Sequence, residues 1–459
     1  MRRMGSIKTT FAAVVAGVAW LAAPAHAQSP VVDFSALDPV IAQELKATGT
    51  PGAAVSIVSG DRVVFSKGYG LANVETRETV RPEMLFRLGS TTKMFTAAAL
   101  VLLAERGAID LTKPIGDYVK GLHPSIARLT AHQLLSHTSG ILDEAPMFGS
   151  HDEAALEKEV RSWTESRFFT EPGRIYSYSN PGYWLSGFVV EVLSGKRYAD
   201  QMEASLFKPL GMSRTTLRPH VAMTYPLAQG HDETPQGPAI IRPIANNAAS
   251  WPAGSMFSSV EDLSRFVIAF VGGGRIGEQQ VLPSAVITRL SQPNVAIPGS
   301  SGSYSYGLEI AKFRGVDVIR HGGSRAGYGS QIVMAPREQV GVVITANRSG
   351  IGLNRTAEKA MELMLPLQPA STTTPTTSTA MTTADMSALA GTYSQAARTM
   401  TIVMREGKLF LQQGGRDIAI EKVRDHEFRA GEARFVVVTG AGGRPEYLHA
   451  GGRSWRKVS

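Results

Sequence analysis

The chain has no cysteine among its 459 residues. This absence excludes disulfide bonds, cysteine nucleophiles and zinc-thiolate sites. The ten histidines are scattered and form no His-Glu-x-x-His motif or comparable cluster, so we expect neither a catalytic metal nor a cofactor. A Gly-x-Ser-x-Gly motif is also absent, which disfavours an α/β-hydrolase. Stability must therefore come from core burial, and any nucleophile must belong to another residue type.

Long apolar runs are missing as well, except for a short one near the N-terminus. Basic residues at positions 2, 3 and 8 precede an apolar run over 11–23, and Ala25-His26-Ala27 follows. These are the parts of a secretory signal peptide in the expected order, and the run is short for a membrane span. We therefore expect a cleaved signal peptide over 1–27 and an exported protein, periplasmic or secreted. A membrane anchor is the competing interpretation.

Charge of one sign is only mildly in excess. The formal net charge of +8 falls to +5 if Arg2, Arg3 and Lys8 leave with the signal peptide, and the chain has no Lys/Arg block. Such a balance is typical of a soluble protein and does not indicate nucleic-acid binding. We expect a small-molecule or peptide substrate and no stable membrane span after cleavage, while the sequence does not indicate an oligomeric state.

Hydrophobic patterning predicts an α+β domain over 28–366. Strand-like runs at 53–58 and 62–67 are joined through Gly60-Asp61, which is typical of a hairpin. Helical patterns dominate from about 130 to 210, including 152–165 and 182–193. Strand patterns return late, followed by a helical pattern, at 316–320, 331–335, 340–346 and 355–364. Strands near both ends with helices between them predict one antiparallel sheet built from the two ends of the domain.

The composition changes sharply after this domain. Ten of the thirteen residues from Ser371 to Thr383 are Ser or Thr, and none is charged, which predicts a linker over 367–384. Beyond it, short alternating runs are punctuated by glycine pairs. They predict a small all-β domain over 385–459, either an antiparallel barrel or a curved sheet.

Ser90 and Lys93 form the first candidate catalytic motif. They precede a helix-forming, almost wholly apolar run over 94–104, so both residues fall at the first turn of a buried helix. A hydroxyl and an amine at a helix N-terminus, where N–H groups stabilise an oxyanion, suit a serine nucleophile and its base. The alternative is a helix cap followed by a solvated lysine. Ser454 and Lys457 repeat the spacing without a following helix, as an accidental match would.

Two further motifs each have a structural alternative. Tyr178-Ser179-Asn180 offers a phenol for proton relay and an amide for substrate binding, or else a turn that caps the next helix. His321-Gly322-Gly323-Ser324 ends a predicted strand, where glycines permit close approach of a ligand and the Ser324 N–H could serve as an oxyanion donor. Its alternative is a β-bulge carrying a surface histidine.

The order of these motifs resembles that of the serine β-lactamase and penicillin-recognising family. Tyr178 follows Ser90 by 88 residues, and His321 follows Tyr178 by 143. The similarity is greatest to the class C β-lactamase-like branch, which includes esterases and D-aminopeptidases, and it covers roughly 31–365. Supporting phrases are Pro51-Gly52-Ala53-Ala54-Val55, Leu134-Leu135-Ser136-His137-Thr138-Ser139-Gly140, Pro209-Leu210-Gly211-Met212 and Ala253-Gly254-Ser255-Met256. The resemblance implies a β-lactamase/transpeptidase-like fold, with an antiparallel sheet flanked by helices and an all-helical region.

The resemblance also implies roles for the site residues. Ser90 would be the nucleophile, Lys93 and Tyr178 the acid/base pair, and Asn180 a substrate-orienting amide. The amides of Ser90 and Ser324 would bind the oxyanion, and His321 and Gly323 would line the substrate site. His137 would belong to a structural turn.

One departure from the family pattern bears on the substrate. Penicillinases usually carry Lys-Thr-Gly where this chain has His321-Gly322-Gly323, and the lysine helps to hold the carboxylate of β-lactams. A histidine attracts an anion less strongly near pH 7. We therefore expect an exported serine hydrolase acting on small esters, D-amino-acid amides or peptides, or β-lactams. The alternatives are a class C-type β-lactamase proper and a non-hydrolytic penicillin-binding sensor.

The C-terminal segment carries a resemblance of its own. Leu389-Ala390-Gly391-Thr392-Tyr393 and the alternation after it resemble the lipocalin-like modules appended to several such hydrolases. We expect the module to modulate the enzyme without contributing to its chemistry. Whether it closes as a barrel is left open by the sequence.

Overall fold

The computed structural model describes residues 32–369, 380–395, 397–413, 415–440 and 442–459. The predicted signal peptide lies outside these residues, as do positions 370–379 of the predicted linker. Within the described ranges, no helix is both long enough and apolar enough to cross a lipid bilayer.

A nine-stranded antiparallel sheet forms the centre of the larger domain, in the order β10-β11-β12-β13-β14-β15-β1-β2-β3. Its middle joins strands from the two ends of the domain, because β1 pairs with β15. The strands are β1 (Gly52–Ser59), β2 (Arg62–Asn73), β3 (Glu78–Thr79), β10 (Val295–Ala296), β11 (Ser303–Tyr304), β12 (Glu309–Phe313), β13 (Val316–Arg325), β14 (Tyr328–Ala335) and β15 (Val340–Ala346). The prediction of an α+β fold with a sheet built from both ends is confirmed.

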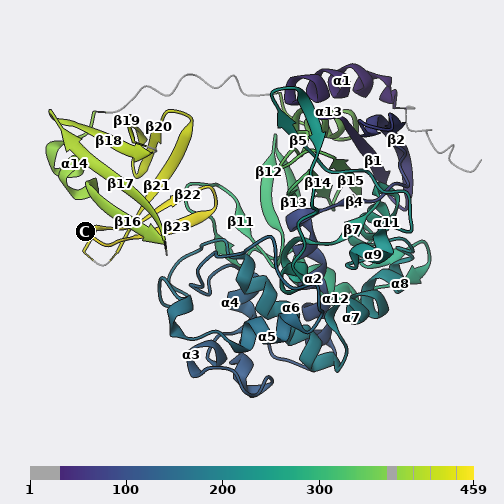
Figure 1. The fold of residues 1–459 in the computed structure, drawn as a ribbon, viewed down its shortest axis with the longest axis horizontal. Helices are drawn as coiled ribbons and strands as arrows, with labels where there is room; N and C mark the ends of the chain where they lie inside the picture. Colours follow the sequence, from purple (N-terminus) through teal and green to yellow (C-terminus); the bar gives the residue numbers. More distant parts are fainter. Residues whose placement is uncertain (1–31, 370–379, 396, 414, 441) are drawn as a thin grey trace, which may run out of the picture. The chain divides into compact units, whose positions relative to one another are not determined.

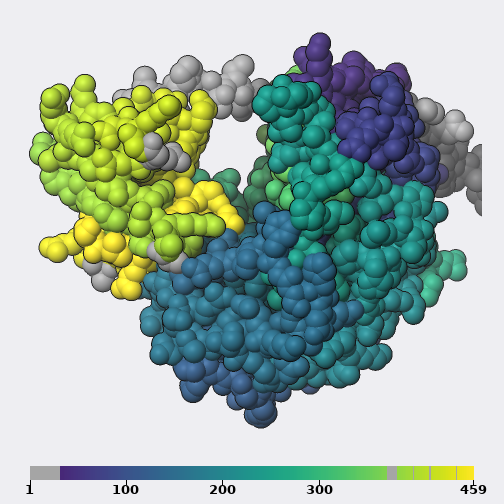
Figure 2. All heavy atoms as spheres, viewed as in Figure 1, coloured from purple at the N-terminus to yellow at the C-terminus, as the bar shows by residue number. Residues whose placement is uncertain are grey.

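Alternate residues of β1 enter two different cores, one on each face of the sheet. Ala53, Val55 and Ile57 pack with α1 (Leu37–Thr48) and α13 (Asn354–Met364). Ala54 and Val58 belong to the larger core on the opposite face, which includes α11 (Val260–Val271). β1 is therefore apolar on both faces, as a central strand covered by helices on each side should be. Figure 1 shows α1 and α13 together on one side of this sheet, and in Figure 2 the purple atoms of α1 lie at the surface.

Helix α2 (Thr92–Glu105) runs through the centre of the helical region, and all of its residues from Thr92 to Leu103 are buried. It packs against α6 (Asn180–Ser194), α10 (Trp251–Gly254) and α12 (Ser284–Leu290). The other α-helices of this domain are α3 (Pro124–Ala127), α4 (Ala131–Leu135), α5 (Ala155–Arg161), α7 (Tyr198–Met202), α8 (Lys208–Leu210) and α9 (Pro219–Ala222). Short helical turns are η1 (Phe34–Ala36), η2 (Gly89–Thr91), η3 (Ile115–Asp117), η4 (Glu165–Arg167), η5 (Glu203–Phe207) and η6 (Ala248–Ser250).

Three strand pairs lie outside the main sheet, namely β4 (Phe86–Arg87) with β7 (Phe257–Ser258), β5 (His231–Thr234) with β6 (Gly237–Ile240), and β8 (Arg275–Ile276) with β9 (Gln279–Gln280). The helix predicted over 152–165 is shorter than expected, because α5 ends at Arg161. The Ser162 hydroxyl donates to the Glu159 carbonyl and satisfies one of the last-turn acceptors there.

The C-terminal residues form a closed eight-stranded barrel, which answers the question of closure that the sequence left open. Its strands are β16 (Gly391–Gln395), β17 (Arg398–Arg405), β18 (Lys408–Gln413), β19 (Arg416–Arg424), β20 (Glu427–Ala430), β21 (Ala433–Thr439), β22 (Pro445–Ala450) and β23 (Arg453–Lys457). Pairing of β16 with β23 closes the ring. Helix α14 (Thr383–Leu389) precedes β16 and adds Met386 and Leu389 to the barrel core.

Candidate active site

Two glycines bring the Ser90 loop against strand β13. Gly89, in η2, has a φ of 58°, and a Cβ atom there would lie 2.5 Å from the Ser324 nitrogen. A Cβ on Gly323 would lie 1.8 Å from the Leu88 carbonyl oxygen. Only glycine fits at either position, so the backbones that carry Ser90 and Ser324 approach each other closely. Two backbone amides beside one hydroxyl are the arrangement that an oxyanion requires.

Lys93 lies one turn after Ser90 and is completely buried. Its Nζ is 3.2 Å from Ser90 Oγ, 2.7 Å from Asn180 Oδ1 and 2.6 Å from the Ala253 carbonyl oxygen. Burial lowers the pKa of Lys93 well below its usual value. The Asp143 carboxylate opposes this shift, and the guanidiniums of Arg453 and Arg325 add to it. Loss of a proton from Lys93 would leave an amine that can donate to these two carbonyl oxygens and accept the Ser90 proton, as a general base must.

Tyr178 lies beside the same hydroxyl. Burial raises the pKa of Tyr178 above its usual value, and its hydrogen bond with Ser90 opposes that shift only in part. The Lys93 Nζ lies 4.8 Å from the centre of the Tyr178 ring. The phenol therefore stays protonated at neutral pH and can give a proton to a leaving group, while Lys93 is the group that can accept one.

The His137 ring packs against the Tyr178 ring and lies outside the Ser90 hydrogen-bond network. Its ring is 4.2 Å from the Tyr178 ring, and its Nδ1 accepts a hydrogen bond from the Ser179 N–H. The residue has a φ of 59°, which places it in a tight turn. Burial also lowers the pKa of His137, so the ring is neutral. These contacts fit the structural turn that the resemblance implies.

Asn180 links Lys93 to a carboxylate that the sequence did not single out. The Asp143 Oδ1 atom accepts hydrogen bonds from the Asn180 backbone N–H at 2.8 Å and from its Nδ2 at 3.0 Å. These bonds fix the amide so that its oxygen faces Lys93. The Ser179 hydroxyl caps α6 at the same point, so the turn alternative and the functional interpretation of this motif apply together.

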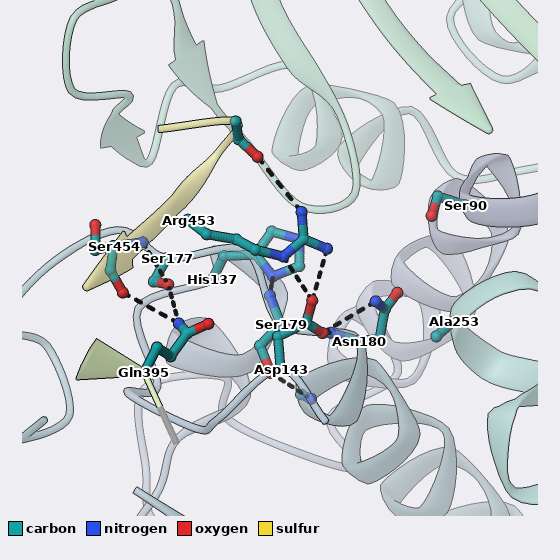
Figure 3. A network of polar contacts seen from close by, with 12 residues as sticks. Ser90, His137, Asp143, Ser177, Ser179, Asn180, Ala253, Gln395, Arg453 and Ser454 are labelled. Carbon is teal, nitrogen blue, oxygen red and sulfur yellow. Dashed lines mark hydrogen bonds and ion pairs between the residues drawn. The ribbon is translucent and has the colours of Figure 1, made fainter. Parts of the chain in front are cut away.

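Arg453, from barrel strand β23, is the second unpredicted residue (Figure 3). Its Nε donates to Asp143 Oδ2 at 2.6 Å, and its guanidinium carbon lies 5.2 Å from the centre of the Tyr178 ring. The Tyr178 N–H also donates to the Gly452 carbonyl at 2.8 Å. The barrel therefore contacts Tyr178 directly, as a module that modulates the site would.

Other contacts tie the barrel to the segment that leads into Tyr178. The Ser177 hydroxyl accepts from the Ser454 N–H and from Gln395 Nε2, both at 3.1 Å, as Figure 3 shows. The Ser454 hydroxyl donates to the Tyr176 carbonyl at 2.9 Å. Ser454 thus has a structural role, and its spacing from Lys457 is accidental.

His321 lies on β13 with both ring nitrogens engaged. Its Nδ1 is 2.6 Å from the Gly322 carbonyl and its Nε2 is 3.0 Å from the Tyr304 hydroxyl. Burial, and then the charge of Lys93, lower the pKa of His321 to about 3. The imidazole therefore donates through Nδ1, accepts through Nε2 and carries no charge at neutral pH, so it cannot hold a carboxylate as a lysine would.

Two cavities meet at Ser90. The first, of about 740 Å³, is lined by His321, Gly323 and Arg453, and we call it the His321 cavity. The second, of about 580 Å³, is lined by Asn180, Trp184 and Arg325, and we call it the Asn180 cavity. No group of three or more potential metal ligands occurs in the described part of the chain.

Comparison with known proteins shows the family of this chain. The family model described as "Beta-lactamase" matches residues 37–365. The chain belongs to the beta-lactamase family. This confirms the resemblance seen in the sequence, and the match ends just before the predicted linker.

Relatives within the family include hydrolases. The chain is 27% identical over 340 residues to the unguisins hydrolase ungD of Aspergillus violaceofuscus, covering 66% of this chain and 59% of that protein. It is 27% identical over 336 residues to a D-aminopeptidase of Gluconobacter oxydans, covering 70% and 60%. The match thus spans about three fifths of the length of these relatives. The crystal structure of SurE shares the fold, with a TM-score of 0.76 at 23% identity over 92% of this chain and 98% of that one.

Proposed function

We propose that this protein is an exported serine hydrolase that works through a Ser90 acyl-enzyme on small esters or D-amino-acid amides and peptides. The observation that carries the proposal is the buried Lys93 Nζ 3.2 Å from Ser90 Oγ, with a lowered pKa and with the Asn180 Oδ1 and Ala253 carbonyl oxygens as its other hydrogen-bond partners. The 27% identity to a D-aminopeptidase favours the D-amino-acid class. Export rests on the signal-peptide pattern of residues 1–27.

The residues divide the reaction as follows. Lys93 takes the Ser90 proton as Oγ attacks the carbonyl carbon, and the Ser90 and Ser324 amides bind the oxyanion that forms. The Tyr178 hydroxyl protonates the leaving group as the carbonyl reforms, and the Lys93 ammonium returns a proton to the phenolate. Hydrolysis of the acyl-enzyme uses the same groups in reverse, with water in place of the leaving group.

Efficient β-lactam hydrolysis is disfavoured by His321. A neutral imidazole whose nitrogens are both engaged offers no positive charge to the β-lactam carboxylate. A class C-type β-lactamase proper is therefore the weaker alternative. A non-hydrolytic sensor is a weaker alternative still, because a binding protein has no need for a lysine of lowered pKa beside its serine.

Intact-mass analysis after a fluorophosphonate probe tests the nucleophile. We expect one adduct on wild type and none on Ser90→Ala, with much slower labelling of Lys93→Met. Labelling of Ser90→Ala as readily as wild type would refute the proposal. Turnover of p-nitrophenyl butyrate, D-alanine p-nitroanilide and nitrocefin then separates the alternatives, since stoichiometric acylation without release on every substrate would identify a sensor.

A further inference from the structure

The Asn180 cavity contains a guanidinium that the proposed mechanism does not use. Arg325 follows the oxyanion residue Ser324 at the end of β13. Its Nη2 makes only two long contacts, 3.3 Å to the Met147 carbonyl oxygen and 3.4 Å to the Ser250 hydroxyl, and its Nε has no hydrogen-bond partner. Burial lowers the pKa of Arg325 to about 10, so the group remains charged at neutral pH.

No counter-ion balances this charge in the described part of the chain. The hydrogen bonds that Arg325 makes there go to neutral oxygens and not to a carboxylate. Asp232 also lines the cavity and accepts a hydrogen bond from Ser349. A second guanidinium, that of Arg87, is fully buried nearby, and burial and then Arg325 lower the pKa of Arg87 to about 9. Arg325 is half-buried, and a partly desolvated cation without an ion partner favours an incoming anion.

Trp184 adds a second hydrogen-bond donor without an acceptor to the same cavity. This residue of α6 is completely buried, lines the cavity, and has no acceptor for its indole Nε1–H. Native structures rarely leave a buried N–H without an acceptor unless a ligand or water provides one. Both residues line this cavity, and an indole N–H and a guanidinium are complementary to a carboxylate, which accepts hydrogen bonds and carries negative charge.

We propose that the Asn180 cavity binds a carboxylate carried by the acyl part of the substrate, with Arg325 as its ion partner and Trp184 Nε1 as a second donor. The inference rests on the proposed function and deepens it, because it names the substrate class as acidic acyl compounds. The resemblance to the family implies that the lysine that holds the β-lactam carboxylate, on the amine side of the scissile bond, stands where this chain has His321. His321 lines the other cavity and not this one, so we assign the Asn180 cavity to the acyl side.

Matched esters test this inference. The mono-p-nitrophenyl ester of adipic acid carries an acyl carboxylate, and its methyl ester has nearly the same shape without the charge. We expect wild type to prefer the acid by about tenfold or more in kcat/KM, which corresponds to about 1.4 kcal/mol. Arg325→Met should bring the ratio of the two substrates close to one, Arg325→Lys should keep part of the preference, and Trp184→Phe should reduce it.

Arg320→Met is the matched control. Arg320 also lies on β13, but its guanidinium is paired with Glu309 at 2.7 Å, so its loss should leave the substrate ratio as in wild type. Fluorophosphonate labelling of Ser90 in each variant shows that the protein is folded. Loss of the preference in Arg320→Met but not in Arg325→Met would overturn the assignment.

A second pair of esters fixes the side of the scissile bond. 4-Acetoxybenzoate and its methyl ester carry the charge difference on the leaving group, and we expect no comparable preference between them. A preference confined to this pair would overturn the inference. Turnover of the neutral adipate ester without preference for the acid would also overturn it while leaving the proposed function intact. Failure of every ester and of the fluorophosphonate at Ser90 would instead refute the function itself.

Discussion

The ion pair between Arg453 and Asp143 should set the pH at which Lys93 becomes a base. Arg453 lowers the pKa of Lys93 and Asp143 raises it. Lys93 Nζ and the Arg453 guanidinium lie 4.8 and 5.2 Å from the centre of the Tyr178 ring, which limits their separation to about 10 Å. Two unit charges about 10 Å apart at an effective dielectric constant of about 20 interact by about 1.7 kcal/mol.

The sign follows from which form of Lys93 reacts. The neutral amine is the base, so the reaction rate rises with pH as Lys93 loses its proton. Arg453→Met removes a repelling cation and leaves the Asp143 carboxylate, with a side chain only 3% exposed, without its partner. Both effects raise the pKa of Lys93, so the acidic limb of the pH–rate profile should move to higher pH. Asp143→Asn leaves Arg453 without its partner, so the limb should move down.

The rate of fluorophosphonate inactivation, measured as a function of pH, is the appropriate assay. Fluoride needs no proton from Tyr178 to depart, so this rate reports activation of Ser90 alone. The double variant lacks both charges and should return the limb toward its wild-type position. Shifts of the two single variants in the same direction, or no shift in Arg453→Met, would refute the electrostatic reasoning.

Three other outcomes follow from the same site. His321→Lys should raise kcat/KM for nitrocefin more than for p-nitrophenyl butyrate, mainly through KM; equal effects would show that His321 does not face the substrate carboxylate. Gly323→Ala should abolish labelling of Ser90 and lower the melting temperature, because its Cβ would lie 1.8 Å from the Leu88 carbonyl oxygen and the backbone must shift. A chain ending at Gln368 should still label at Ser90 and accept bulkier esters. The acidic limb of its pH–rate profile should move to higher pH, as in Arg453→Met; an unchanged limb would show that the barrel does not affect the pKa of Lys93.

The parts of the site visible in the sequence are those carried by short local patterns. Ser90 and Lys93 lie one helical turn apart, and Tyr178 and Asn180 lie together before a helix, so spacing alone brings each pair into view. Asp143 and Arg453 are 310 residues apart in the chain, and their contact depends on how the barrel lies against the larger domain. Neither residue belongs to a recognisable sequence motif, so the sequence did not predict their contact.

The same distinction holds for the fold. The sequence predicted β1, β15 and α13, because the spacing of apolar residues in each element matches the face or faces that it buries. β12 was missed because Glu-Ile-Ala-Lys-Phe does not alternate, and its residues are at most partly buried. In the barrel, β20 has only four residues and β22 begins at a proline, so neither forms a long alternating run.

The pairing of β1 with β15 has a consequence for how the protein folds. Gly52 bonds to a residue 295 positions later, and the Glu44 carboxylate accepts hydrogen bonds at the start of α13, 312 positions away. Bringing together chain ends about 300 residues apart costs on the order of 5 kcal/mol in chain entropy, before any contact repays it. The barrel is assembled largely from successive hairpins and faces a much smaller search, so it should form first. Reactivity at Ser90 should therefore appear late in refolding, well after the barrel strands are protected from hydrogen exchange.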